Sequence, residues 1–109
     1  RREDFDLLVS SLVAELADRW PAVSSIEFAT EDVPPSDPAP WERSVVLGRG
    51  FTAEPRAGLP ARVVIYRRPV ASRVMGEADL ADLVRRVVVE QVALILGRRP
   101  EEIDPSSGV

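Results

Sequence analysis

The acidic residues near the carboxyl end of the sequence are the first candidates for chemistry. Glu90 lies inside a long apolar segment, and Glu101, Glu102 and Asp104 follow it. Carboxylates suit hard cations such as Ca²⁺ and Mg²⁺, but the Asp-x-Asp-x-Asp-Gly loop that arranges such ligands is missing. A pair of acids could also carry acid–base catalysis, yet no two acids have a spacing that singles them out. We therefore expect the acids after Pro100 to begin a short turn of helix.

The sequence contains no histidine, no cysteine and no lysine. Histidine is the commonest metal ligand and the usual proton carrier at physiological pH, and zinc sites are built mainly from histidine and cysteine. The serines have no histidine or lysine partner that would activate them as nucleophiles. Gly48-x-Gly50 lacks the further glycine of a phosphate-binding loop. The sequence therefore predicts no cofactor and no enzymatic activity.

Two amphipathic helices are predicted, one near each end of the chain. The first ends near Trp20, because Pro21 disfavours helical geometry in the residue before it. Its apolar face consists of Phe5, Leu8, Val9, Leu12, Val13, Leu16 and Trp20. The second covers about residues 77–96 and ends at Gly97. Apolar residues lie on nearly all its sides, which is typical of a helix buried in the middle of a domain, and the only glutamine, Gln91, falls within its main apolar stripe.

Three short strands are predicted between the helices, at residues 25–30, 44–48 and 62–66. The third is apolar at consecutive positions, as expected where both faces of a sheet are covered. Residues 31–43 are rich in proline and acids and predict a loop. Gly48 and Gly50 suggest a bulge or a bend near the end of the second strand. The order of the elements predicts an α+β fold, with a twisted sheet of three or four strands and the long helix packed across one face.

Length and composition narrow the class of protein and its partners. The 109 residues fit one small domain, residues 1–109. The net charge of -4 argues against binding nucleic-acid phosphate, and no run of about 18 apolar residues predicts a membrane span. All fourteen basic residues are arginine, a bias that resembles proteins of GC-rich bacterial genomes. The absence of cysteine and of a signal segment favours a cytoplasmic location.

The segment Val64-Ile65-Tyr66-Arg67-Arg68-Pro69, followed by a spacer and an apolar helix that carries Glu90, resembles the small bacterial zincin-like metallopeptidases. In that family a strand ending in a Tyr-Arg-Arg-Pro-like sequence precedes a helix that bears His-Glu-x-x-His, then a glycine and a third metal ligand. The resemblance covers most of the chain. It implies a minimal zincin-like fold in which residues 77–96 form the former active-site helix.

The resemblance places Val89 and Ala93 where the family has its two histidines, and Glu90 where it has the catalytic acid. Residues at i and i+4 share one helix face, which is why two such histidines can bind one zinc ion. In the family the acid acts as general base on a zinc-bound water. With valine and alanine at the ligand positions, the resemblance implies that the metal site is lost and that Glu90 would be a vestigial catalytic residue.

A second alignment is open, because Gly97 stands one residue farther from Glu90 than the family spacing requires. Aligning on Gly97 places Glu90 and Leu94 at the histidine positions and moves Pro100 towards the place of the third ligand. Neither alignment supplies the ligands of a zinc site.

Glu90 and Tyr66 each have a structural interpretation beside the functional one. We favour Glu90 as a helix residue paired with Arg86, four positions earlier, over a vestigial acid. We likewise favour Tyr66 as a strand aromatic with a packed ring and a solvated hydroxyl, over a residue that lines a cleft.

The sequence thus predicts a catalytically inactive zincin-like homologue that binds a peptide or protein partner. A hydrolase that uses an unforeseen metal site or ligands supplied by a partner is the alternative, and a structural role as a homodimer is also open. Zincins typically add their substrate to a sheet edge, which implies a peptide along residues 45–51, beside Val89 and Ala93. The favoured rival is that these two side chains fill the former metal cavity.

Overall fold

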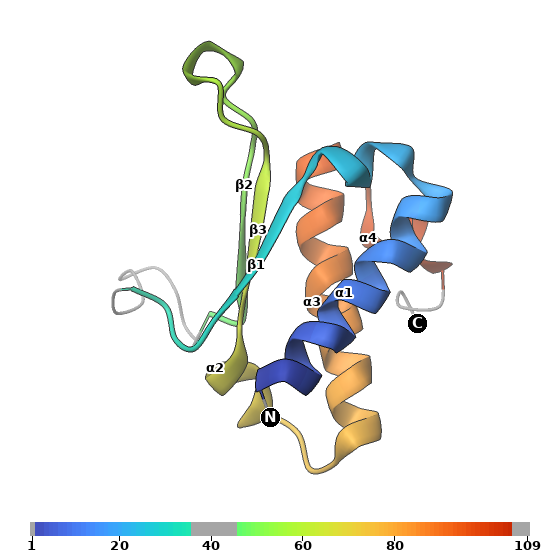
Figure 1. Ribbon diagram of the computed structural model, residues 1–109. Coiled ribbons are helices and arrows are strands. Elements are labelled where there is room, and N and C mark those ends of the chain that lie inside the picture. Colours follow the sequence, from blue (N-terminus) through green and yellow to red (C-terminus); the bar gives the residue numbers. More distant parts are fainter. Residues whose placement is uncertain (1, 36–45, 106–109) are drawn as a thin grey trace.

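A three-stranded sheet lies against two long helices (Figure 1). The computed structural model describes residues 2–35 and 46–105. In chain order the elements are α1 (Arg2–Arg19), the 3-10 helix η1 (Pro21–Ser25), β1 (Glu27–Glu31), β2 (Gly48–Phe51), the 3-10 helix η2 (Pro55–Ala57), β3 (Arg62–Tyr66), α2 (Arg67–Ala71), α3 (Glu77–Leu96) and α4 (Pro100–Ile103). The predicted α+β class and the packing of the long helix on one face of the sheet are confirmed.

Strand β3 is the centre of the sheet. It pairs in parallel with β1 on one side and antiparallel with β2 on the other, so that the strand order is β1-β3-β2. Val63 and Ile65 point into the main core, while Val64 and Tyr66 point to the opposite face, and all four are buried. The prediction that both faces of this strand are covered is confirmed.

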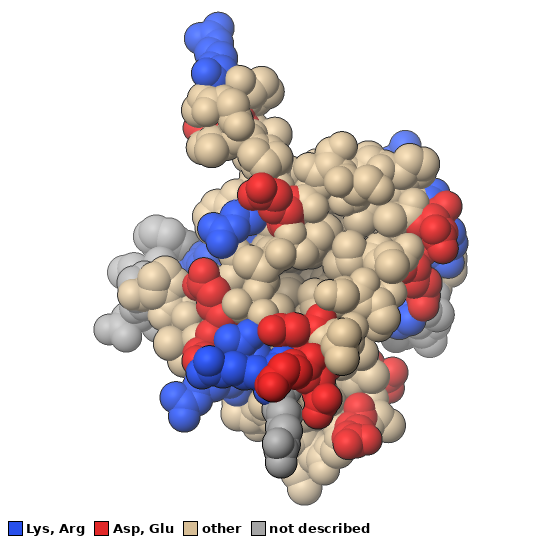
Figure 2. All heavy atoms as spheres, viewed as in Figure 1, with Lys and Arg blue, Asp and Glu red and all other residues tan. Residues whose placement is uncertain are grey.

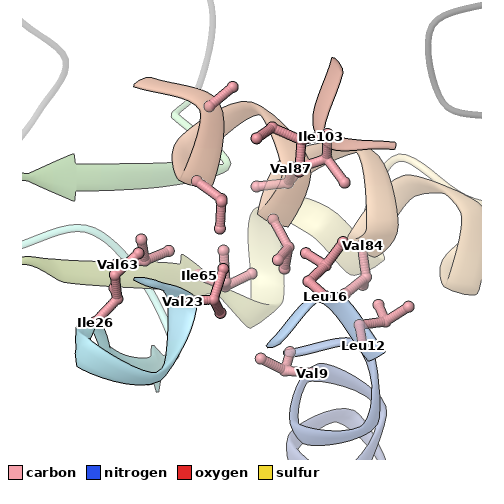
Figure 3. Close-up of a cluster of buried hydrophobic side chains, with 14 of the residues drawn as sticks. Val9, Leu12, Leu16, Val23, Ile26, Val63, Ile65, Val84, Val87 and Ile103 are labelled. Atoms are coloured by element: carbon pink, nitrogen blue, oxygen red, sulfur yellow. The ribbon is translucent and has the colours of Figure 1, made fainter. Parts of the chain in front are cut away.

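The core lies between the sheet and the two long helices, where side chains from α1, β3 and α3 point towards one another (Figure 3). Helix α1 contributes the predicted apolar face, of which Phe5, Val9, Leu12 and Leu16 are buried. It ends as predicted, because Pro21 has no N–H with which to extend the ladder after Trp20.

Helix α3 has the predicted bounds and runs through the middle of the fold. It contacts α1, α2, α4, β2 and β3, which explains why apolar residues lie on so many of its sides. Gly97 ends it in the left-handed conformation (φ 67°), which glycine adopts without a steric penalty. The predicted turn after it is α4, which begins at Pro100. None of the described helices is long and apolar enough to cross a membrane.

The boundaries of two strands and of the loop differ from the predictions. The second strand covers Gly48–Phe51 rather than 44–48, so Gly48 and Gly50 are strand residues and form no bulge; residues 44 and 45 lie outside the described ranges. Glycine has a low strand propensity, but close packing against α3 overrides it here. The first strand begins two residues later than predicted because Ser25 belongs to η1, and it extends one residue further, to Glu31. Of the predicted loop, residues 36–43 lie outside the described part of the chain.

Candidate functional site

Strand β2 packs directly on helix α3 through its two glycines. A Cβ atom at Gly48 would lie 2.8 Å from Cγ1 of Val87, and one at Gly50 would lie 3.0 Å from Oε1 of Gln91 and 3.5 Å from Cδ2 of Leu94. The step of two residues from Gly48 to Gly50 along β2 therefore corresponds to about one turn of α3, from Val87 to Gln91. Strand β2 and helix α3 run in the same direction. Without side chains at these positions the strand lies close to the helix surface.

The outer edge of β2 carries hydrogen-bonding groups that face away from β3. The backbone N–H of Tyr66 donates to the carbonyl of Leu47 (3.0 Å), so these two residues form a hydrogen-bonded pair of the antiparallel ladder. Such pairs alternate along the strands, which makes Arg49 the next residue of β2 to bond to β3. The N–H and C=O groups of Gly48 and Gly50 therefore point outward. No strand among residues 2–35 and 46–105 pairs with that edge.

The two positions first aligned with the family histidines lie in the hydrophobic core. Val89 is 1% exposed and Ala93 is 2% exposed. Strand β2 instead meets α3 at Val87, Gln91 and Leu94, so the expectation that the sheet edge lies beside Val89 and Ala93 is wrong. Their burial agrees with the rival expectation, in which these side chains fill the interior.

The positions of the second alignment lie on the surface of α3. Glu90 is exposed, and Leu94 is 63% exposed even though it is a large apolar residue. Gln91 meets β2 at Gly50 and is half-buried, so its amide can reach water and does not need an internal partner. Within the described residues no ion pair joins Glu90 to Arg86, so the pairing that we favoured is not found. Leu94 thus lies beside Gly50 at the free edge of β2, and Glu90 is exposed one helical turn earlier.

The Tyr-Arg-Arg-Pro segment has a structural role in this fold. Tyr66 is 2% exposed, and burial raises the pKa of its hydroxyl, which accepts a hydrogen bond from Arg49. Its ring is packed as expected, but its hydroxyl is enclosed rather than solvated. Arg67 donates to Asp32 and Asp6, each at 3.0 Å, and so ties α1 to the end of β1.

The acids after Pro100 also hold elements together. Arg85 of α3 donates to Glu15 of α1 (2.6 Å) and to Asp104 (3.0 Å), whose side chain is almost fully buried. Glu102 accepts a hydrogen bond from the backbone N–H of Arg99 (2.9 Å), which lowers the pKa of that carboxyl. These acids therefore anchor the segment after α3 and begin α4, as expected of a helical turn.

A separate hollow of about 730 Å³ opens where the starts of α1 and α3 approach α2. Phe5, Leu8 and Leu80 form its apolar part, and Arg68 and Asp32 stand at its polar part. Basic and acidic side chains are interleaved on the face shown around α2 (Figure 2). None of the described residues that line this hollow belongs to β2, and its mixed charges favour no single class of ligand.

The chain matches a known protein family over most of its length. A family model described as zincin-like metallopeptidase matches residues 23–109. The chain belongs to this family. A search of curated proteins found no match. The fold agrees with the assignment, since a small mixed sheet precedes the long helix α3, the arrangement that the resemblance implied.

The residues of this zincin-like chain do not fit a zinc ion. The sequence has no histidine or cysteine, and neither aligned pair of helix positions contains a nitrogen or sulfur ligand. Within residues 2–35 and 46–105, no three acidic side chains gather where they could hold a metal ion.

Gly48, Gly50 and Leu94 lie together at the contact between β2 and α3, which was not predicted from the sequence. The spacing Gly-x-Gly in a short segment, which places both glycines on one face of a strand, was the available signal for close packing against a helix.

Proposed function

We propose that this chain is a catalytically inactive zincin-like domain that binds extended peptides along the outer edge of β2. The observation that carries the proposal is the combination of a strand edge without a described partner and an exposed apolar residue, Leu94, beside it. An extended peptide could add to this edge, where main-chain hydrogen bonds would supply affinity and the surface of α3 would supply selectivity.

Loss of catalysis is supported by the chemistry of the aligned positions. The first alignment offers Val89 and Ala93, and the second offers Glu90 and Leu94, so neither gives the pair of imidazoles that a zincin needs. Gln91 takes the place of the general base in the second alignment, and an amide cannot accept a proton at neutral pH. Binding of the polypeptide requires neither metal nor base.

The absence of hydrolysis is tested on the purified chain. After dialysis against a weak chelator the protein should retain no stoichiometric zinc by elemental analysis, and it should cleave neither casein nor a peptide library. One equivalent of retained zinc, or zinc-dependent cleavage, would show that ligands come from an unforeseen source and would overturn this part of the proposal.

Binding is tested by selecting peptides from a random decapeptide library on the immobilised chain. The selected peptide is then synthesised with one N-methyl group at each position in turn. Binding to a β-strand edge predicts that N-methylation weakens affinity at every second residue, because only alternate N–H groups of an added strand bond to β2. The intervening N-methyl peptides serve as matched controls.

Two results would contradict the binding proposal. Affinity that falls equally at all N-methylated positions, or at none, would exclude strand addition. A stable dimer in sedimentation velocity that is broken by Gly50→Pro would show that a second copy of the chain, rather than a peptide, covers the β2 edge.

A further inference from the structure

We infer that the β2 edge selects peptides in which an apolar residue is followed, two positions later, by a basic residue. The inference rests on the proposed function and deepens it by naming the class of peptide. Two side chains of α3 carry it: Leu94, which is 63% exposed, and Glu90, which is exposed one helical turn earlier.

The glycines of β2 leave room for the side chains of an added strand. Gly48 and Gly50 face α3, and an added strand would lie about 4.8 Å beyond β2. In an antiparallel pair, residues directly opposite one another point to the same face. The residues opposite the two glycines would therefore point towards α3 and meet no side chain from β2. Their contacts would be with the flank of the helix.

The spacing of the helix residues matches that of alternate strand residues. Glu90 and Leu94 are four residues apart, which is about 6 Å along a helix axis. Residues that are two positions apart along a strand are separated by about 6.6 Å. Two consecutive inward side chains of a bound peptide would consequently lie one over each of these helix residues.

The direction of the peptide follows from the parallel course of β2 and α3. Gly50 lies next to Leu94, whereas Gly48 lies at Val87, nearer the start of the helix. Glu90 precedes Leu94 by one helical turn and helical side chains lean towards the N-terminus, so we place Glu90 on the Gly48 side of Leu94. Antiparallel addition is the more stable pairing per residue. A peptide in that direction passes Gly50 first and Gly48 second, which gives the order apolar, then basic.

Charge complementarity with Glu90 determines which residue the peptide carries at its second inward position, opposite Gly48. Glu90 forms no ion pair with Arg86 within the described part of the chain, so its carboxylate is available to an arginine or lysine of a bound peptide. A solvent-accessible pair of this kind changes affinity by about twofold to fivefold and weakens with added salt. The effect is modest, but reversing the charge of Glu90 should reverse the preference.

The test compares three heptapeptides by NMR titration of the isotope-labelled chain, at low and at high salt. The first is Thr-Thr-Leu-Thr-Arg-Thr-Thr, the second exchanges its leucine and arginine, and the third carries glutamate in place of arginine. The unmodified chain should bind the first peptide about twofold to fivefold more tightly than either of the others. Glu90→Lys should instead prefer the glutamate peptide, and the control Asp18→Lys, an exposed charge reversal on α1, should leave the order unchanged.

The outcomes separate this inference from the proposed function. If the peptides bind with an alternating response to N-methylation, but Glu90→Lys does not change their order, strand addition stands and the selectivity inferred here is wrong. A preference for the second peptide over the first would overturn the inferred direction. If no peptide binds and the library yields none, the proposed function itself fails. Because Glu90 is exposed, its substitution should leave the melting temperature within a few degrees of the original.

Discussion

A Cβ atom added to Gly48 would lie 2.8 Å from Cγ1 of Val87 and 3.1 Å from the carbonyl oxygen of Val64. The glycine therefore lies between the central helix and the central strand, with no room for a methyl group. Its neighbour on the same face, Gly50, meets only the end of the flexible Gln91 side chain at a comparable distance (3.0 Å).

We expect Gly48→Ala to lower the free energy of unfolding by about 1–3 kcal/mol, because it overpacks the contact between β2 and α3. The matched change Gly50→Ala should cost less, since Gln91 can move and alanine restricts the unfolded chain more than glycine does. Urea denaturation of both variants measures the difference. Equal losses would show that β2 does not approach α3 as closely at Gly48 as described.

A second prediction compares two pairs of histidine substitutions on α3. Val89→His with Ala93→His should lower the free energy of unfolding by about 3 kcal/mol or more, because it places two imidazoles in a packed apolar core. Glu90→His with Leu94→His changes exposed positions and should cost less than about 1 kcal/mol.

Zinc binding by the same two pairs distinguishes the alignments. Both pairs have the i, i+4 spacing, but only the exposed pair can reach a metal ion from solvent. Isothermal titration should detect Zn²⁺ binding to the exposed pair and none to the buried pair. Zinc uptake by a folded Val89→His, Ala93→His variant would show that an open site exists at these positions and would favour the first alignment.

Helix α3 illustrates what could be predicted from the sequence. Its bounds follow from local signals, since Gly97 supplies the left-handed residue at its end and acids occupy its first turn. Its central place in the fold follows from the apolar residues on nearly all its sides. What a helical wheel cannot tell is which apolar strip meets which neighbour. The distinction between buried Val89 and exposed Leu94 depends on tertiary packing, because both residues are apolar.

Strand β2 illustrates the reverse. Local propensity favours Val45 and Val46 as strand residues and disfavours Gly48 and Gly50, so the prediction placed the strand too early. The pairing register with β3 and the close packing against α3 determine where the strand begins and ends. Neither can be predicted from the local sequence. The candidate site is formed by this contact between distant segments, so only the general location of the edge could be predicted.

A third prediction concerns Arg67, which lies in the segment that resembles the family sequence. Its guanidinium bonds Asp6, Asp32 and the hydroxyl of Thr30, with a side chain that is 15% exposed. Arg67→Lys should lower the free energy of unfolding by about 1–2 kcal/mol, because an ammonium cannot reproduce these divergent hydrogen bonds. Arg68→Lys, at an exposed position, is the control and should change it by less than about 0.5 kcal/mol. Similar losses in the two variants would contradict the structural role of Arg67.

The last prediction is the dependence of stability on pH through Glu15. Hydrogen bonding from Arg85, the largest influence, lowers the pKa of the Glu15 carboxyl from its ordinary value of 4.5 and raises that of the guanidinium. A carboxyl whose pKa is lower in the folded state stabilises the fold above its unfolded pKa, and this contribution is lost as the pH falls through the folded value. The charges of two further residues also act on the pKa of this carboxyl: Asp104 raises it and Arg19 lowers it.

We therefore expect Glu15→Gln to lower the free energy of unfolding by at most about 1 kcal/mol at pH 7, where the exposed pair is fully charged. The difference between the variant and the original chain should shrink as the pH falls below 4.5 and vanish near pH 2, because the original carboxyl is then protonated as well. Urea denaturation at several pH values measures this, with Glu54→Gln in the exposed hairpin as a control for the loss of one negative charge. A deficit of constant size down to pH 2 would mean that Glu15 stabilises the fold by packing rather than by its bond to Arg85.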